Sequence, residues 1–395
     1  MNKINVAVVF GGRSVEHEVA IISGVQAMNN LNPDKYNILP VYLGKDGEML
    51  YSSEFMDINT FKHRSLAALK EKYPSVVLTR MDGTVCLLEL KKQGKKGKIL
   101  ASVDVVLPVV HGTNGEDGTV QGWLELLGVP YAGCSVTSSA LGMDKDLFKR
   151  VLQAAGLPAL PHLAFYGKDW TSEPTAWIEK IESQFGYPVI VKPATLGSSV
   201  GISKAKNRDE LIAAVDLATS FAQKILVERA VTNLREINCS VLGDCDECRA
   251  SECEEPLSND EILSFQDKYL STGSSKGMTS LKRKLPADSP DELKKRIQTI
   301  SCEVFRLIGA GGVVRIDYLL EGDAVYVNEI NTIPGSLAFY LWEATGIKYK
   351  DLLDKLIELA FKQARTKDGL MFTYETNILE SAQGFGAKGA KGSKM

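Results

Sequence analysis

Short apolar runs and helical stretches alternate over the first part of the chain. Residues 4–10, Ile-Asn-Val-Ala-Val-Val-Phe, have the length and composition of a buried strand, and a turn at Gly11-Gly12-Arg13-Ser14 separates them from a helical stretch over 16–29. Further strands are predicted over 38–43 and 103–110. This alternation indicates a parallel α/β domain of about 135 residues whose ligand groups lie on the loops at the strand ends.

A second unit begins near Thr137. Helical periodicity over 141–155 ends at Gly156-Leu157-Pro158, and a strand over 188–193 stops at a proline. Further strands are predicted over 225–228, 236–242, 312–320 and 324–330, and helices over 288–307 and 349–365. The last stretch, 382–395, repeats Gly-Ala-Lys and Gly-Ser-Lys with a single large apolar side chain, so we expect a disordered tail.

The composition is typical of a globular chain. Hydrophobic residues make up 44% and charged residues 24% of the 395 residues, which rules out global disorder. The formal charge of -3 lacks the basic excess of a dedicated nucleic-acid binder. No apolar run approaches the roughly 18 residues of a membrane-spanning helix, and the chain starts as a strand and not as a signal peptide. We therefore expect a cytoplasmic protein with reduced cysteines and with no nucleic-acid or membrane partner.

Two chemistry-bearing patterns fall on a predicted hairpin, Arg315-Ile316-Asp317 and Asn328-Glu329-Ile330-Asn331. Strand side chains alternate between faces, so Glu329 and Asn331 share a face, roughly 6 to 7 Å apart, as do Arg315 and Asp317. A three-residue loop at 321–323 would place Asp317 opposite Glu329 and Arg315 opposite Asn331. Oxygen ligands without His or Cys suit Mg²⁺. The alternative is a surface hairpin with a cross-strand salt bridge; we favour a metal site because the two patterns occur together.

A glycine- and hydroxyl-rich loop runs from Lys192 to Gly201. Glycines let the backbone approach a ligand, and successive N–H groups with two hydroxyls can bind phosphate oxygens. The loop lacks the Gly-Lys-Ser/Thr of a Walker A motif, and an ordinary hairpin turn is the alternative. The positive charge that a triphosphate requires can come from Lys145, Lys192 and Lys268.

Two more loops follow the predicted strands and their turns. Residues 111–122 hold four glycines, which indicates a tightly folded loop near a ligand, although a lone histidine such as His111 is more often structural than catalytic. Glu16-His17-Glu18 follows the first glycine turn, where the helix dipole alone favours a carboxylate. Neither loop identifies a function by itself.

Taken in order, these motifs resemble those of the D-alanyl-D-alanine ligases, a family of ATP-grasp enzymes. The residues that carry the resemblance are Gly11 to Glu18, the loop 111–122, Met143-Asp144-Lys145, Val191-Lys192-Pro193 with 197–201, Lys268-Tyr269, and Arg315-Ile316-Asp317 with 328–335. The resemblance implies an α/β N-terminal parallel-sheet domain followed by an α+β ATP-grasp fold of two subdomains. The expected divisions are an N-terminal domain over 1–136, a central subdomain over 137–228, a C-terminal subdomain with the metal site over 229–370, and a mostly disordered tail over 371–395.

The resemblance also implies a reaction. ATP would phosphorylate the carboxylate of a first D-alanine, and the amine of a second would displace phosphate to give D-alanyl-D-alanine for peptidoglycan synthesis. A homodimer is implied as well. Phosphoryl transfer needs alignment and charge neutralisation, and an acyl phosphate needs shielding from water. The polar stretch 264–280 is the expected lid.

Each site residue has an expected role by resemblance. Glu16 would hold the ammonium group of the first substrate, with Ser198 and Tyr269 linked to it. Arg315 and the backbone N–H of Gly335 would stabilise the tetrahedral intermediate, and His111 and Ser336 would contact substrate. ATP would be bound by Lys145, Lys192, Ser198, Ser199 and Lys268 at the phosphates, by Glu228 at the adenine and by Glu236 at the ribose. Two Mg²⁺ or Mn²⁺ ions would be held by Asp317, Glu329 and Asn331.

The acceptor stays open. In the family a serine and a leucine a few residues after Pro-Gly bind the carboxylate of the second substrate, whereas this chain has a shortened Ser336-Leu337-Ala338, in which Ser336 is the candidate substitute. Lys268-Tyr269 resembles the forms that use D-alanine; D-lactate, D-serine or another amino acid is the alternative.

Two other classes of protein explain less of the sequence. A dinucleotide-binding oxidoreductase would need Gly-x-Gly-x-x-Gly, which the first turn lacks. A non-catalytic ATP-binding sensor would not need the full set of metal and phosphate ligands that the chain carries. Cys239, Cys245, Cys248 and Cys253 invite a zinc site, but their spacing does not match paired knuckles, so we expect reduced thiols. The basic run 91–98 is expected to be a solvated hairpin tip.

Overall fold

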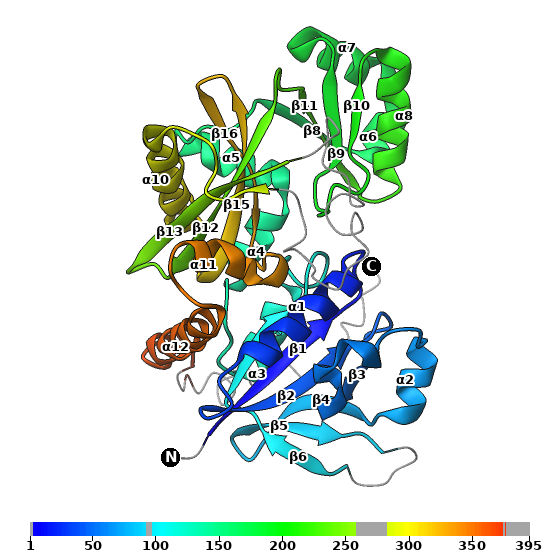
Figure 1. Ribbon diagram of the computed structural model, residues 1–395. Coiled ribbons are helices and arrows are strands. Elements are labelled where there is room, and N and C mark those ends of the chain that lie inside the picture. The colour runs from blue at the N-terminus through cyan, green and yellow to red at the C-terminus, as the bar shows by residue number, and fades with distance from the viewer. Residues whose placement is uncertain (1–2, 92–96, 258–282, 374–375, 377–395) are drawn as a thin grey trace, which may run out of the picture.

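Three β-sheets organise the computed structural model, which describes residues 3–91, 97–257, 283–373 and 376. In Figure 1 the first sheet lies at the bottom in blue and cyan, the second at the upper right in green, and the third at the upper left. Several predictions lie outside the described residues: the lid with Lys268 and Tyr269, positions 92–96 of the basic run, and positions 377–395 of the tail.

The first sheet has seven strands in the order β6-β5-β4-β3-β2-β1-β7. Its centre, β1 (Ile4–Gly11), runs parallel to β2 (Tyr36–Leu43) and β7 (Val105–Val109), which confirms the predicted parallel core. Four antiparallel strands extend the sheet beyond β2: β3 (Met49–Tyr51), β4 (Ser75–Met81), β5 (Thr84–Glu89) and β6 (Ile99–Ser102). The loops after β1 and β7 therefore leave the same edge of the sheet.

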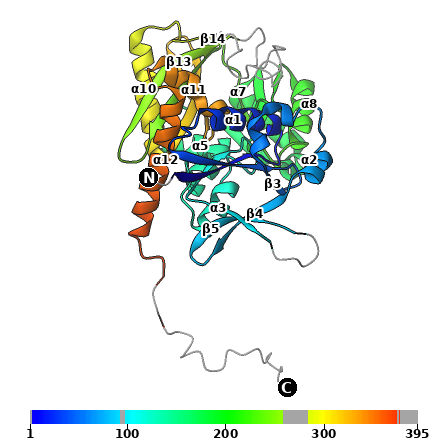
Figure 2. The same ribbon diagram turned by 60° about the horizontal axis from the view of Figure 1, so that its bottom comes forward.

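Helices cover both faces of β1 because its residues are apolar without alternation. Val6, Val8 and Phe10 share a core with α1 (His17–Asn30) and α12 (Tyr349–Asp368), whereas Ala7 and Val9 share the opposite core with α3 (Thr119–Leu127) (Figure 2). The far end of the chain thus completes the N-terminal core. Smaller helices lie at the edge: η1 (Ser53–Met56), η2 (Ile58–Thr60) and α2 (Leu66–Lys72).

The second sheet is antiparallel, in the order β10-β9-β11-β8. Its strands are β8 (His162–Tyr166), β9 (Val189–Pro193), β10 (Ser203–Ala205) and β11 (Lys224–Arg229), packed with α6 (Gly167–Ser172), α7 (Pro174–Phe185) and α8 (Arg208–Thr219). The single helix predicted over 141–155 is instead two helices, α4 (Val136–Met143) and α5 (Lys145–Ala154). The break falls at Asp144, whose carboxylate accepts the N–H groups of Asp146 and Leu147 and so caps α5.

The third sheet, also antiparallel, has the order β14-β13-β12-β15-β16. Its strands are β12 (Arg235–Gly243), β13 (Cys248–Pro256), β14 (Arg283–Lys284), β15 (Gly312–Glu321) and β16 (Ala324–Asn331). Ile237, Ile316 and Tyr318 pack with α10 (Asp291–Leu307) on one face. Alternating residues of the same strands, among them Asn238 and Asp317, therefore line the other face. A tight turn, η4 (Gly335–Ala338), and α11 (Phe339–Ala344) follow β16.

None of the helices in the described segments is both long and apolar enough to span a bilayer.

Candidate active site

The β15–β16 hairpin brings the predicted metal-binding side chains together. Asp317 lies opposite Glu329 and Arg315 lies opposite Asn331, which confirms the predicted pairing. The predicted three-residue loop is wrong, because Glu321 pairs with Ala324 and leaves a two-residue turn. A regular register from that turn would set Asp317 against Asn328; a bulge at Asn328 shifts the register by one residue and restores the pair with Glu329.

Basic groups compensate the two carboxylates. The guanidinium of Arg315 donates from Nε and Nη2 to the two oxygens of Asp317, both at 2.7 Å, and the amide of Asn331 donates to Asp317 Oδ2 at 3.2 Å. Lys145 Nζ lies 3.0 Å from Glu329 Oε2. Although burial lowers the pKa of Arg315, nearby Asp317 raises it well above its ordinary value, so this guanidinium stays charged.

The donor set suits a hard divalent cation. Asp317 and Glu329 supply carboxylate oxygens on one face, with Asn331 beside them. Over the described part of the chain, no group of three or more His, Cys, Asp or Glu side chains is placed to hold a metal ion. A cation here would therefore rely on two carboxylates, one amide and oxygens of a bound substrate, which is the usual arrangement for Mg²⁺ beside phosphates.

Three buried lysines, buried Glu228 and partly buried Glu329 form a charge cluster next to the hairpin. Glu228 on β11 lies 2.5 Å from Lys192 Nζ and 3.0 Å from Lys149 Nζ. Lys192 also donates to Asn328 Oδ1, at 3.2 Å, and thereby contacts the bulge. Burial raises the pKa of Glu228, but the two lysines outweigh it and lower this pKa to about 2. With Lys145 and Glu329 included, the cluster carries one excess positive charge, which favours an anion.

Lys149 is a member of this cluster that the sequence analysis did not identify. Its side chain is fully buried, and burial lowers its pKa. It lies four residues after Lys145 and therefore on the same face of α5. That spacing is a signal that sequence reasoning could have used. Glu228, the residue expected at the adenine, is buried between Lys149 and Lys192.

The glycine-rich loop reaches across to the first domain. Ser198 Oγ donates a hydrogen bond to Glu16 Oε1, so the expected link between these residues is present. Ser198 and Ser199 have left-handed backbones, with φ of 56° and 59°, a conformation that residues other than glycine seldom adopt. Glu16 is 6% exposed, so two loops from different domains enclose one carboxylate.

Glycine is needed where these loops approach Glu16. At Gly112 a Cβ would lie 2.4 Å from Glu16 Oε2 and 2.6 Å from Ser14 Oγ, and at Gly197 it would lie 3.0 Å from Glu16 Oε2. Distances under 3 Å force the neighbour to move. Gly112 also has a φ of +71°, which favours glycine.

His111 is structural in its contacts. It is 2% exposed, with Nδ1 2.7 Å from the carbonyl oxygen of Ile333 and Nε2 2.8 Å from Ser23 Oγ. Burial lowers its pKa to about 4. The ring therefore joins the loop after β7 to the segment after β16.

Glu116 makes a second connection between the same segments. Its carboxylate accepts the backbone N–H of Gly112 at 2.9 Å and that of Ile333 at 2.8 Å. Burial and then the charge of Glu16 raise its pKa to about 8. Sequence reasoning placed Glu116 in a loop but gave it no role, because its partner Ile333 is 217 positions away.

Ser336 makes its hydrogen bonds with residues of the first domain. Its hydroxyl donates to Gln26 Oε1 at 2.7 Å, its N–H donates to Ser23 Oγ at 2.9 Å, and it is 1% exposed. The hydroxyl therefore has a partner other than substrate. Gly335 begins this turn, in which Ser336, Leu337 and Ala338 have φ of 51° to 54°.

The remaining predicted residues are placed as follows. Glu236 lies on β12 opposite Leu319, and its side chain is half-buried. The four cysteines are spread along the β12–β13 hairpin: Cys239 pairs with Cys253 in the core, Cys245 is exposed at the turn, and Cys248 faces Cys302 of α10. All seven cysteines are free. Their arrangement does not close a tetrahedral zinc site.

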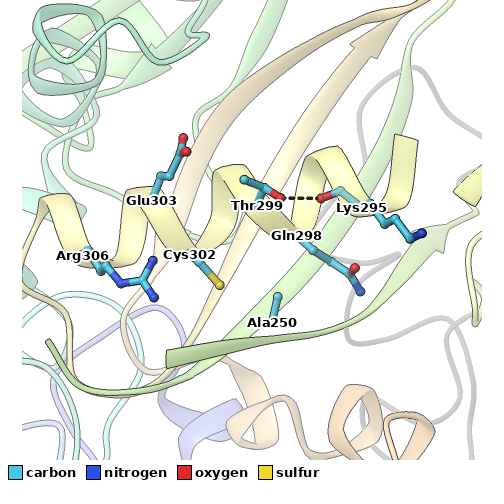
Figure 3. Close-up of a pocket in the computed structure, with 7 residues that line it drawn as sticks. All are labelled: Ala250, Lys295, Gln298, Thr299, Cys302, Glu303 and Arg306. Atoms are coloured by element: carbon cyan, nitrogen blue, oxygen red, sulfur yellow. Dashed lines mark hydrogen bonds between the residues drawn. The ribbon is translucent and has the colours of Figure 1, made fainter. Parts of the chain in front are cut away.

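A separate hollow of about 520 Å³ lies between α10 and β13 (Figure 3). It contains no predicted site residue. Its lining comes from Ala250, Lys295, Gln298, Thr299, Cys302, Glu303 and Arg306.

Comparison with known proteins places most of the chain in one family. The family models "D-ala D-ala ligase N-terminus" and "D-ala D-ala ligase C-terminus" match residues 5–134 and 151–358. A D-alanine–D-alanine ligase of Caldicellulosiruptor bescii is 39% identical over 95% of this chain and 100% of its own, and that of Acetivibrio thermocellus is 38% identical over 92% and 97%.

Solved structures agree. The D-alanine–D-alanine ligase from Coxiella burnetii has a TM-score of 0.76 at 30% identity and covers 93% of this chain and 97% of its own. The VanG D-Ala:D-Ser ligase from Enterococcus faecalis has a TM-score of 0.76 at 30% identity, covering 91% and 100%. The chain therefore belongs to the D-alanine–D-alanine ligase family and has its ATP-grasp fold.

Proposed function

We propose that this protein is an ATP-dependent carboxylate–amine ligase that joins two D-alanines. The carboxylate of the first D-alanine attacks the γ-phosphorus of ATP, giving an acyl phosphate and ADP. The amine of the second attacks the acyl carbon, the C–O bond to phosphate breaks, and D-alanyl-D-alanine, phosphate and a proton are released. The dipeptide would serve peptidoglycan synthesis.

The ion pair between Lys145 and Glu329 carries this proposal. It joins the lysine cluster, which suits phosphate oxygens, to the hairpin carboxylates, which suit a divalent cation. A terminal phosphoryl group at this junction would meet positive charge from both sides, as phosphoryl transfer requires. Two Mg²⁺ or Mn²⁺ ions held by Asp317, Glu329 and Asn331 would supply further charge neutralisation at that group.

The lysine cluster and the glycine-rich loop supply groups that would bind the nucleotide. Lys145, Lys192, Ser198 and Ser199 would bind its phosphates, with Lys268 assigned the same role by resemblance, and Glu228 and Glu236 would lie on the side of the adenosine. The excess positive charge of the buried lysines supports this assignment.

The first D-alanine would place its ammonium group at Glu16. The enclosed carboxylate, closed by Ser198, supports this role because a buried negative charge favours a cationic partner. Arg315 and the N–H of Gly335 would stabilise the negative charge on the tetrahedral intermediate, with Tyr269 helping to close the site. Glu116 and His111 would hold the segment that carries Gly335.

D-Serine is the second candidate acceptor. The VanG D-Ala:D-Ser ligase has the same TM-score, 0.76, as the Coxiella burnetii enzyme, so the fold alone does not discriminate between D-alanine and D-serine as acceptor. The experiment is to incubate the purified protein with ATP, Mg²⁺ and D-alanine, alone or with D-serine, D-lactate or another D-amino acid, and to identify products by mass spectrometry. D-Alanyl-D-alanine from D-alanine alone supports the proposal; a product only with another acceptor contradicts it.

We propose further that the ligase acts in the cytoplasm as a homodimer, without nucleic-acid or membrane partners. The formal charge of -3 supports the absence of a nucleic-acid partner. The three sheets support a division into 1–136, 137–228 and 229–370, with α12 returning to the first domain, and with the remaining residues 371–395 as a tail.

A further inference from the structure

An acceptor amino acid brings a carboxylate that needs a basic partner in the site. Ser336, the residue expected to bind it, already donates its hydroxyl to Gln26. Arg315 is engaged by both oxygens of Asp317. The carboxylate of the acceptor therefore needs another basic side chain near η4, with an N–H group that lacks an acceptor.

A row of polar side chains leads from the metal-binding pair to such a group. Glu329, Asp317, Asn238 and Glu254 are successive partners across β16, β15, β12 and β13. Residues paired across neighbouring strands project to the same face, with the strands about 4.8 Å apart. The amide of Asn238 donates to Glu254 Oε1 at 3.0 Å, so Glu254 continues the polar face beyond the hairpin.

Arg283 lies at the end of this row. Its Nη1 donates to Glu254 Oε2 at 2.9 Å, and its guanidinium lies 4.1 Å from the ring centroid of Tyr340. The hydroxyl of Tyr340 donates to Glu254 Oε1 at 2.7 Å, so three side chains fix one another. Only 11% of the Arg283 side chain and 3% of the Glu254 side chain are exposed.

One nitrogen of this fixed guanidinium has no acceptor. Nη2 of Arg283 is buried and has no hydrogen-bond partner among the described residues. Arginine does not lose its proton in proteins, and a buried N–H group of a charged side chain without an acceptor costs free energy. Buried polar groups seldom lack a partner, so an oriented N–H group of this kind favours a bound ligand, ion or water at this position.

The position suits the second substrate. Tyr340, whose ring contacts the guanidinium of Arg283, comes five residues after Gly335, whose backbone N–H is proposed to stabilise the tetrahedral intermediate. Tyr340 lies on α11, which directly follows the turn η4. Glu254 pairs with Asn238, and Asn238 pairs with Asp317, the hydrogen-bond partner of Arg315. Arg283 and Arg315 therefore flank the same region from two strands.

We propose that Arg283 binds the carboxylate of the acceptor through Nη2, with Glu254 and Tyr340 orienting its guanidinium. This inference rests on the proposed ligase function and specifies its acceptor class. The acceptor carries a free carboxylate next to its nucleophile, as D-alanine, D-serine and D-lactate do. Amides and esters of these compounds are poor acceptors.

The test compares D-alanine with D-alaninamide as acceptor, with D-alanine as donor throughout. The variant is Arg283→Met, and the matched control is Arg249→Met, which removes an exposed arginine stacked at 5.4 Å on Trp342 of the same helix, α11. We expect Arg283→Met to raise the acceptor KM for D-alanine about 10- to 100-fold and to leave the KM for ATP unchanged. The preference for D-alanine over the amide disappears in this variant only.

An unchanged acceptor KM and an unchanged preference in folded Arg283→Met would overturn the inference. Should this variant not fold, Arg283→Lys takes its place, because lysine keeps the charge but cannot reach Glu254 and a second carboxylate with a fixed fork. A several-fold loss of preference supports the inference, and full retention overturns it. If the parent protein forms no product with any acceptor, the proposed function itself fails, which is a different result.

Discussion

Asp317 faces Glu329 across the β15–β16 hairpin because Asn328 is left unpaired in a bulge. Asn328 also contacts the lysine cluster, because its side-chain oxygen accepts a hydrogen bond from Lys192 at 3.2 Å. One local irregularity therefore aligns two carboxylates and connects them to the lysine cluster. Bulges commonly redirect side chains next to active sites in this way.

Replacing Glu329 with Gln should remove activity and spare the fold. The change deletes one of the two carboxylates that would hold a divalent cation, and we expect turnover to fall by at least about 100-fold. Thermal unfolding should shift by less than about 5 °C. Glu303→Gln on the exposed side of α10 is the control and should keep full turnover. Near-normal activity of Glu329→Gln would contradict the metal assignment.

Gly112→Ala should reduce activity with the first substrate more than it destabilises the fold. Its Cβ would lie 2.4 Å from Glu16 Oε2. Gly156→Ala is a matched control, because its φ of +74° resembles the +71° of Gly112 while nothing lies within 4 Å of its Cβ. Both changes carry the left-handed strain of about 1 kcal/mol, but only the first displaces Glu16. We expect kcat/KM for the donor to fall about 100-fold in Gly112→Ala alone; equal losses in both variants would contradict this view of Glu16.

Glu228 should make the protein more stable above pH 4.5 than below it. Its pKa is lowered from 4.5 to about 2, so its contribution is complete above pH 4.5 and is lost as the pH falls from 4.5 to 2. Urea unfolding of the parent and of Glu228→Gln should therefore differ most near neutral pH, by about 3 kcal/mol, and converge toward pH 2. A difference that does not change with pH would argue against ionised Glu228 between two lysines.

Glu116 should contribute less to stability as the pH rises, which is the opposite of the pH dependence expected for Glu228. Burial and the charge of Glu16 raise its pKa from 4.5 to about 8, with Arg315 and two backbone N–H groups opposing the shift. The folded protein then binds more protons than the unfolded chain between pH 4.5 and 8, so the stability from Glu116 declines as the pH rises through that range. As the pH is raised from 5 to 9, the melting temperature of Glu116→Gln should increase relative to that of the parent protein. A constant difference would show that Glu116 ionises normally.

Much of this site could be predicted from the sequence because its signals are local. Alternation along each strand placed Arg315 with Asp317 on one face and Glu329 with Asn331 on one face, and the run from Ile4 to Phe10 identified the central strand. The pairing of Asp317 with Glu329 was predicted from a three-residue loop, and it holds because the bulge at Asn328 compensates for the shorter turn. The link between Ser198 and Glu16 came from a family resemblance.

Other features depend on partners far along the chain. The contact of Glu116 with Ile333 and the burial of Lys149 beside Glu228 arise only when three sheets come together. The bulge at Asn328 has no signal in a two-residue periodicity, and the break at Asp144 depends on a side-chain cap that competes with a continuous helix. Pattern reasoning also could not show that the hydroxyl of Ser336 is already bonded to Gln26.

The most direct test of phosphoryl transfer onto a substrate carboxylate follows an oxygen atom. The protein is incubated with ATP, Mg²⁺ and D-alanine labelled with ¹⁸O in its carboxylate, and the dipeptide and the released phosphate are analysed by mass spectrometry. We expect D-alanyl-D-alanine together with phosphate that carries one labelled oxygen from the donor. Unlabelled phosphate, or ATP hydrolysis without dipeptide, would contradict the account.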